Sequence, residues 1–108
     1  SAKREAIVEE RRVFVERILR ERYACEACRI TPVGGWRARP STDCHELLRR
    51  SQGSPIVPSQ GLTADDVVAC CRTCHDWITT NPAEAVALGL ARWGMRDNPP
   101  STGVASVP

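Results

Sequence analysis

The chain has 108 residues, enough for one small domain whose hydrophobic core alone would be marginal. Its formal net charge of +2 excludes a polycation, although the positive charge is almost all arginine, with 14 Arg against the single Lys3. Arginine favours contact with phosphate through its planar fork of donors. The sequence has no transmembrane run or signal peptide, so we expect no membrane association and a cytoplasmic location.

The first predicted element is an amphipathic helix. Its periodicity covers residues 3–23, and we assign 1–22 as the N-terminal segment of the chain. The apolar stripe must pack on the rest of the domain or on a partner protein. Its members recur at spacings of three, four and seven residues: Ile7, Val8, Phe14, Val15, Ile18, Leu19 and Tyr23.

Two Cys-x-x-Cys pairs follow, and they are the strongest signal in the sequence. The pairs are Cys25 with Cys28 and Cys71 with Cys74, which together offer the four thiolates of a tetrahedral structural zinc site. A zinc ribbon separates its pairs by roughly 15–20 residues, whereas 42 residues lie between Cys28 and Cys71. The zinc is therefore predicted to close a large loop and to supply stability that a small core lacks.

Other readings of the six cysteines are less favoured. A disulfide framework does not need Cys-x-x-Cys pairs, and no βαβ pattern surrounds either pair, as a thioredoxin-like redox site would require. A zinc register that uses Cys70 in place of Cys71 would need a Cys-x-x-x-Cys spacing. We expect Cys44 and Cys70 to be small buried hydrophobic residues.

The loop between the pairs holds turns and one extended segment. Proline and a Gly-Gly pair mark turns over residues 31–40, and residues 41–48 are predicted to be extended. This segment carries a cluster of polar groups, Asp43-Cys44-His45-Glu46. After a loop over residues 51–61, Thr63 is a candidate N-cap with Asp66 at the capping-box position.

Two short helices are expected after the second cysteine pair. One covers residues 74–80, and a second starts with Asn81 as N-cap and Pro82 at the first position and runs to about residue 93. Leu47, Trp77 and Ile78 are expected in the core. Residues 98–108 are rich in Pro, Ser and Gly and are predicted to be a disordered tail, so that the zinc-stapled domain spans 23–97.

The order of these motifs resembles the HNH endonucleases, in particular the zinc-stapled HNH proteins of phages and actinobacteria. The resemblance covers about residues 23–90 and rests on the two cysteine pairs, on His-Glu-Leu-Leu-Arg-Arg-Ser-Gln-Gly-Ser from 45 to 54 and on Cys-Arg-Thr-Cys-His from 71 to 75. It implies an α+β fold, a zinc-stapled ββα-metal core with an N-terminal and a C-terminal helix. His45 and His75 match metal-ligand positions, Glu46 matches the general-base histidine, and Asp66 matches the asparagine.

The resemblance also implies a second divalent ion, such as Mg²⁺, Mn²⁺, Ni²⁺ or Zn²⁺. His45 and His75 would hold it, and Asp43 or Asp66 could add a carboxylate. Glu46 would act on water or share the ion, although an ordinary Glu is a weaker base than His by about two pKa units. Arg49 and Arg50, beside this site in the sequence, are the candidate phosphate contacts.

The function expected from this resemblance is metal-dependent DNA cleavage, by nicking or by double-strand cutting. A phage origin would place the protein in the host cytoplasm, with a terminase or another protein as a partner through the N-terminal helix. Glu46 and Asp66 depart from the HNH pattern, and these departures favour an alternative, a catalytically impaired zinc module that binds nucleic acid or protein. A plain zinc-finger regulator would leave the cluster from Asp43 to Glu46 without a role.

Both histidines also have ordinary structural readings. His75 could be an alternative zinc ligand or a helix residue that binds no metal, because it directly follows Cys74. His45 could be a hydrogen-bonded strand residue.

Overall fold

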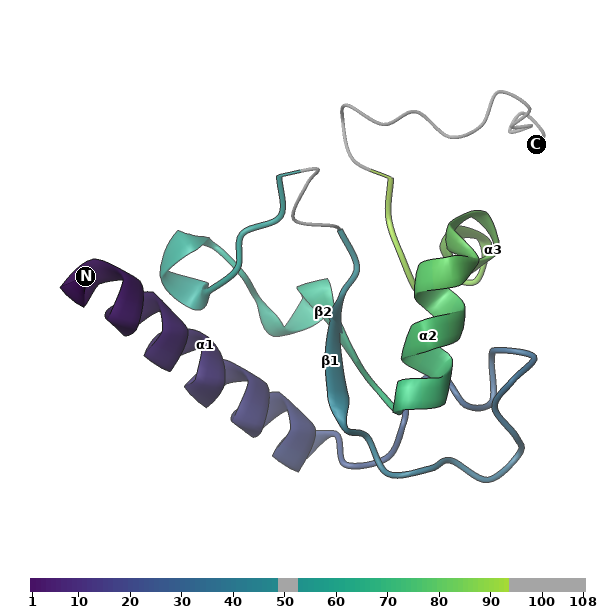
Figure 1. Ribbon diagram of the computed structural model, residues 1–108. Coiled ribbons are helices and arrows are strands. Elements are labelled where there is room, and N and C mark those ends of the chain that lie inside the picture. Colours follow the sequence, from purple (N-terminus) through teal and green to yellow (C-terminus); the bar gives the residue numbers. More distant parts are fainter. Residues whose placement is uncertain (49–52, 94–108) are drawn as a thin grey trace.

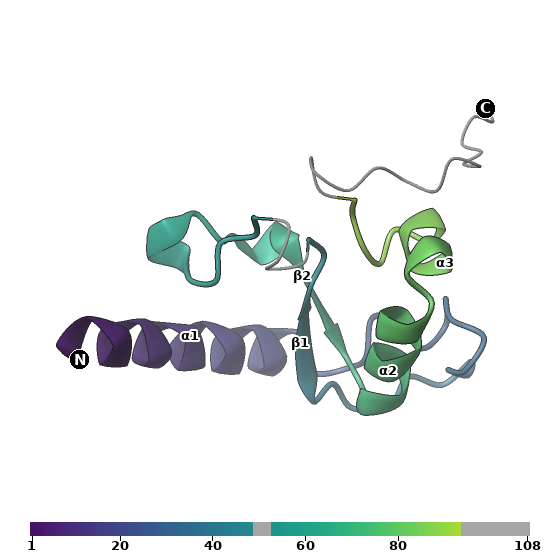
Figure 2. The same ribbon diagram turned by 45° about the horizontal axis from the view of Figure 1, so that its top comes forward.

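A two-stranded antiparallel sheet lies between a long N-terminal helix on one side and two short helices on the other (Figures 1 and 2). The computed structural model describes residues 1–48 and 53–93. The predicted α+β class is confirmed at this level. The elements, in chain order, are α1 (Ala2–Glu21), β1 (Asp43–Glu46), the 3₁₀ turns η2 (Pro58–Gln60) and η3 (Ala64–Asp66), β2 (Val67–Cys70), α2 (Arg72–Thr80) and α3 (Pro82–Ala87).

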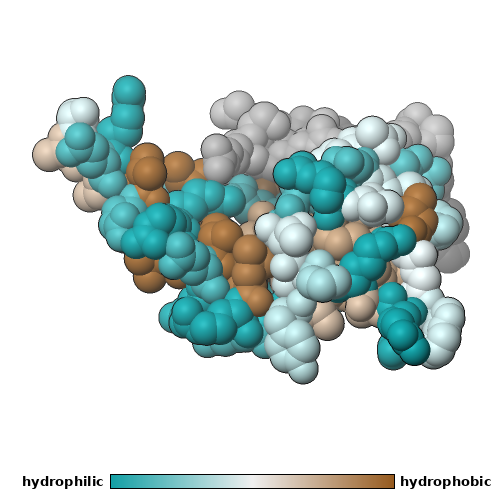
Figure 3. All heavy atoms as spheres, turned by 60° about the horizontal axis from the view of Figure 1, so that its bottom comes forward, coloured by the Kyte–Doolittle hydropathy of each residue, from teal (hydrophilic) through white to brown (hydrophobic). Residues whose placement is uncertain are grey.

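Helix α1 matches the predicted helix within two residues at each end. It begins after Ser1, whose hydroxyl accepts a hydrogen bond from the Arg4 backbone N–H at 3.3 Å. Its buried residues Phe14 and Ile18 pack against β2 and Leu62. The N-terminal end of α1 projects from the rest of the protein (Figure 1), and hydrophilic and hydrophobic side chains both lie on its surface (Figure 3). Val8 and Val13 on this helix are exposed.

Strand β2 separates two hydrophobic clusters. It pairs antiparallel with β1, in the register that sets Asp43 opposite Cys70 and Glu46 opposite Val67. All of its side chains are buried, and Val67 and Ala69 face the α1 cluster, whereas Val68 and Cys70 face the cluster around the cysteines. These residues were not predicted to form a strand, because a short run of apolar residues carries no periodicity that identifies a strand.

The two C-terminal helices are displaced from their predicted bounds. Helix α2 starts two residues before the predicted start at residue 74, with Cys71 at its N-cap, and α3 ends at Ala87 rather than near residue 93. Gly89 has φ of +78°, a left-handed conformation that stops the helix. Asn81 precedes Pro82 as expected, but its side-chain amide donates to the Trp77 carbonyl at 2.9 Å instead of capping α3.

The predicted capping box at η3 is confirmed. The Thr63 backbone N–H donates to Asp66 Oδ2 at 2.9 Å, and the Thr63 side chain completes the box. Leu47 and Ile78 are buried in the core and Trp77 packs against it, as expected. Arg49, Arg50 and the predicted tail over residues 98–108 lie outside the described residues. Within the described ranges, no helix is both long enough and apolar enough to cross a membrane.

Candidate metal centre and the adjoining histidine pair

The four cysteines of the two Cys-x-x-Cys pairs converge on one buried point. The Sγ atoms of Cys25, Cys28, Cys71 and Cys74 all lie within 4.8 Å of one another. Cys28 Sγ is 3.9 Å from both Cys71 Sγ and Cys74 Sγ. Four sulfurs at about 2.3 Å from a tetrahedral zinc ion would be about 3.8 Å apart. These residues could therefore hold a metal ion such as zinc.

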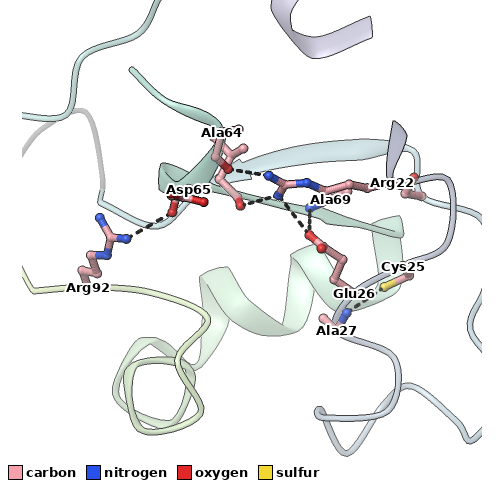
Figure 4. Close-up of polar contacts among 10 residues, drawn as sticks. Arg22, Cys25, Glu26, Ala27, Ala64, Asp65, Ala69 and Arg92 are labelled. Atoms are coloured by element: carbon pink, nitrogen blue, oxygen red, sulfur yellow. Dashed lines mark hydrogen bonds and ion pairs between the residues drawn. The ribbon is translucent and has the colours of Figure 1, made fainter. Parts of the chain in front are cut away.

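Glu26, inside the first pair, aligns that pair with the second (Figure 4). Its backbone N–H donates to the Ala69 carbonyl at 2.8 Å, and its carboxylate accepts the Ala69 N–H at 2.8 Å. Arg22 adds a contact to Glu26 at 3.3 Å and donates to the carbonyl oxygens of Ala64 and Val67. These bonds fix the first cysteine pair against Ala69 in β2, which lies two residues before Cys71.

The second pair gains its geometry from α2, where Cys71 is the N-cap and Cys74 lies in the first turn. Burial raises the pKa of the Cys74 thiol to about 12, so a metal ion that bound there would displace its proton. Burial opposes ionisation of Cys71, but hydrogen bonds from the Cys74 backbone N–H and from Arg39 lower the pKa of the Cys71 thiol below its ordinary value. A lowered pKa favours metal binding because the metal takes the thiolate form.

Two further side chains surround the sulfurs. Arg39 Nη1 lies 3.4 Å from Cys71 Sγ and 3.6 Å from Cys28 Sγ, and its backbone N–H donates to Cys28 Sγ at 3.4 Å. The buried Thr31 hydroxyl lies 3.3 Å from Cys74 Sγ. A zinc ion with four thiolates carries two net negative charges, so a guanidinium at the sulfurs offsets part of that charge.

The remaining cysteines lie outside the cluster. Cys70 is fully buried, and Cys44 is partly buried on the α1 side of the sheet. Burial raises the pKa of the Cys44 thiol to about 11 and raises that of Cys70 further. Both are therefore neutral thiols at physiological pH, as expected of small hydrophobic residues.

The two histidines meet between β1 and α2. The His45 and His75 rings are 5.2 Å apart between centroids, at an angle of 63°. Consecutive side chains on a helix point about 100° apart, which lets Cys74 reach the cysteine cluster while His75 faces β1. His75 is thus not a member of the cysteine cluster.

Asp43 holds one of these rings in place. Its Oδ2 lies 2.7 Å from His75 Nδ1 and 3.4 Å from Arg72 Nε. Partial burial acts to raise the pKa of Asp43, but the contacts with His75, Thr42 and Arg72 lower it below the ordinary value. An ionised carboxylate only accepts hydrogen bonds, so His75 Nδ1 carries the proton and Nε2 keeps its lone pair when the ring is neutral.

Glu46 lies on the other face of β1. Strand side chains alternate, so Asp43 and His45 face α2 whereas Glu46 faces α1. Its Oε2 forms an ion pair with Arg11 Nη1 at 2.5 Å, and the Glu46 side chain is only 9% exposed. Arg11 also donates to the Ile56 carbonyl at 2.7 Å, which ties α1 to the loop before η2.

Asp66 stabilises the local fold, because its carboxylate is held by Thr63 and by Arg92. Besides the capping box, it accepts a hydrogen bond from Arg92 at 3.1 Å. Among the described residues, the four cysteines form the one group of three or more His, Cys, Asp or Glu residues poised for a metal. The sequence did not indicate the roles of Arg11 and Glu26, and only Glu26, between two ligands, had a local signal. Arg39, after the Gly-Gly turn, was a weaker candidate for phosphate contact, and its contact with the sulfurs was not predicted.

No family model, no curated protein and no solved structure matches this chain. The fold and the site define a small α+β protein with a four-cysteine cluster that could hold a metal ion and, beside it, a histidine pair.

Proposed function

We propose that this protein is a metal-dependent DNA endonuclease of the HNH type. The observation that carries the proposal is the meeting of His45 and His75, from a strand and from the helix that follows the hairpin, beside Asp43. The order β1, β2, α2 is the order expected of a ββα-metal unit. Support also comes from the four-cysteine cluster, because a structural zinc there would fix the start of α2.

His45 and His75 would hold the catalytic divalent ion. The Asp43 contact at Nδ1 of His75 leaves Nε2 as its ligand atom, and a carboxylate behind a ligating histidine is a common arrangement at metal sites. We therefore assign Asp43 to orienting His75 rather than to binding the ion directly. A divalent ion at this site would polarise the scissile phosphate and stabilise the leaving oxygen.

The resemblance makes Glu46 the candidate that accepts the proton of the attacking water, although its side chain faces α1, on the side of β1 opposite His45, and would have to leave Arg11 to reach that site. Its ion pair with Arg11 provides a competing role in holding α1 on the sheet. The second candidate function, a binding module without cleavage, is favoured by this ion pair and by the single poised metal cluster among the described residues. DNA is the proposed partner of the nuclease, with Arg49 and Arg50 as proposed phosphate contacts, and nucleic acid or protein is the proposed partner of the binding module.

A terminase or another phage protein remains a proposed partner through α1. Phe14 and Ile18 on this helix are already buried against the sheet, whereas Val8 and Val13 are exposed nearer its N-terminal end. The part of α1 that projects in Figure 1 is therefore the part offered to a partner.

Plasmid nicking with Mg²⁺, Mn²⁺, Ni²⁺, Co²⁺ and Zn²⁺ tests the proposal. We expect His75→Ala to abolish cleavage and Asp43→Asn to reduce it by about 10–100-fold, because the amide does not hold the ring as the carboxylate does. Asp76→Asn is the matched control on α2, since Asp76 is exposed and contacts Arg72 at 3.9 Å. All variants should keep their zinc and their helical content.

Two outcomes separate the candidate functions. If the wild-type protein binds DNA but cuts none with any of these ions, cleavage is wrong and the binding module is favoured. Arg49→Ala with Arg50→Ala should make the salt dependence of DNA binding shallower in either case. An unchanged salt slope would remove both arginines from the interface.

A further inference from the structure

Trp36 is an exposed aromatic residue on the loop between the first cysteine pair and β1. Its exposed fraction is 79%, which is the highest of any large hydrophobic residue in the part of the chain that the structure describes. A buried aromatic side chain removes about 150–250 Å² of surface from water, which stabilises the fold, whereas this exposed indole buries little of its surface. A single exposed apolar side chain is common on protein surfaces. The case for a binding role therefore depends on the loop that presents Trp36 and on the charges around it.

The backbone of this loop is fixed against the first cysteine pair. The Gly35 N–H donates to the Cys28 carbonyl at 2.9 Å, and Arg29 Nε donates to the Trp36 carbonyl at 2.8 Å. Gly34 packs so closely that an added Cβ would lie 1.8 Å from the Cys28 carbonyl oxygen. The indole is thus presented by a backbone braced on the metal centre.

The surroundings of Trp36 are positively charged. The Arg37 guanidinium lies over the indole, 5.4 Å from its centroid, which is a cation–π arrangement. Residues 27–42 contain Arg29, Arg37 and Arg39 and no Asp or Glu. A shallow depression of about 580 Å³ adjoins the indole. It is lined by Cys28, Arg29, Thr31, Pro32, Gly34, Gly35 and Trp36.

We propose that this loop, residues 29–39, binds single-stranded nucleic acid. An unpaired base would stack on the Trp36 indole, and Arg29 and Arg37 would contact the flanking phosphates. Every base has a face that stacks on an aromatic ring, whereas the bases of an intact duplex are already stacked on one another. The loop should therefore prefer unpaired strands, with little dependence on base sequence.

This inference does not rest on the proposed cleavage. It concerns a surface built on the first cysteine pair, whereas the histidine pair lies between β1 and α2. If both hold, the loop would direct the proposed nuclease to DNA that has an unpaired segment. If cleavage fails, the binding prediction is unchanged.

The inference is tested by measuring the affinity of the zinc-loaded full chain for labelled single-stranded oligonucleotides of about 12 nucleotides, by fluorescence anisotropy without added divalent ions. Trp36→Ala should weaken binding of single strands by about tenfold or more, and Trp36→Phe should retain most of it because a planar ring remains. Tyr23→Ala is the matched control, since Tyr23 is 76% exposed outside the loop. DNA and RNA versions of the oligonucleotide show which strand the loop prefers.

Three results would overturn the inference. The first is wild-type affinity in Trp36→Ala at unchanged zinc content. The second is an equal loss of single-strand affinity in Tyr23→Ala, which would mean that binding does not depend on this loop in particular. The third is a Trp36-dependent interaction with a poly-glutamate peptide but none with single strands, which would make the partner an acidic protein segment. The assay measures binding without added divalent ions, so a protein that cuts no DNA can still pass it, and failure here is distinguishable from failure of the nuclease proposal.

Discussion

The Arg39 guanidinium lies 3.4 Å from Cys71 Sγ, although the two residues are 32 positions apart in the chain. The contact crosses the large loop that the cysteine pairs close, and Arg39 also donates to the Val33 carbonyl at 3.1 Å. One side chain therefore links the loop to both cysteine pairs.

Replacing Arg39 by Met should accelerate metal loss, because it keeps the aliphatic stem and removes the charge that faces the thiolates. We expect zinc transfer to a colorimetric chelator to become about tenfold faster. Arg37→Met is the control on the same loop, since Arg37 lies over Trp36. Equal transfer rates in the two variants would show that Arg39 does not act on the metal centre.

The metal centre itself should take one zinc ion per chain and should be required for folding. Cys74→Ala should lose the ion and cooperative thermal melting, because structural zinc contributes about 10–16 kcal/mol in small domains. Cys44→Ala and Cys70→Ala should keep zinc, since neither belongs to the cluster. Zinc retention by Cys71→Ala together with loss from Cys70→Ala would instead support the alternative ligand register.

The ion pair between Glu46 and Arg11 should stabilise the fold. Glu46→Gln should lower the free energy of unfolding by about 1–3 kcal/mol, because it leaves Arg11 without its charged partner. Arg11→Met should do the same, and the double variant should lose less than the sum of the two. Strictly additive losses in urea unfolding would mean that the pair contributes nothing.

Because it belongs to the capping box, Asp66 should contribute to the stability of the fold. Asp66→Ala should cost about 1 kcal/mol and leave any nuclease activity of the folded protein intact, because its carboxylate is held by Thr63 and Arg92. Asp65→Ala, at the neighbouring exposed position, is the control. A loss of cleavage at full stability would return Asp66 to the candidate metal ligands.

Features that depend on residues close together in the sequence were predicted better than contacts between distant residues. The helix over α1, the box between Thr63 and Asp66 and each Cys-x-x-Cys pair depend on residue types at short spacing, and the structure contains all of them. The meeting of the two pairs across 42 residues was predicted from zinc chemistry, because a structural zinc ion takes four ligands. The pairing of Arg11 with Glu46 crosses 35 positions, and no pattern along the chain announces it.

The secondary structure of buried segments was the hardest feature to predict from the sequence. A strand that is buried on both faces has no alternation of polar and apolar residues, so Val67–Cys70 carried no strand signal. The end of α3 was misplaced for a different reason, because periodicity continued past Gly89 while its left-handed backbone ended the helix. The side of β1 that each polar group faces followed only from the observed register.

The burial of β2 on both faces bears on how the protein tolerates mutation. Neighbouring side chains in this strand belong to different clusters, so enlarging or shrinking one disturbs either the α1 side or the cysteine side. A compensating change would have to arise in the matching cluster, and α1 and α2 lie on opposite sides of the sheet (Figure 2). A saturation scan should therefore find Val67–Cys70 among the least permissive positions, whereas the exposed side of α1 should accept most substitutions.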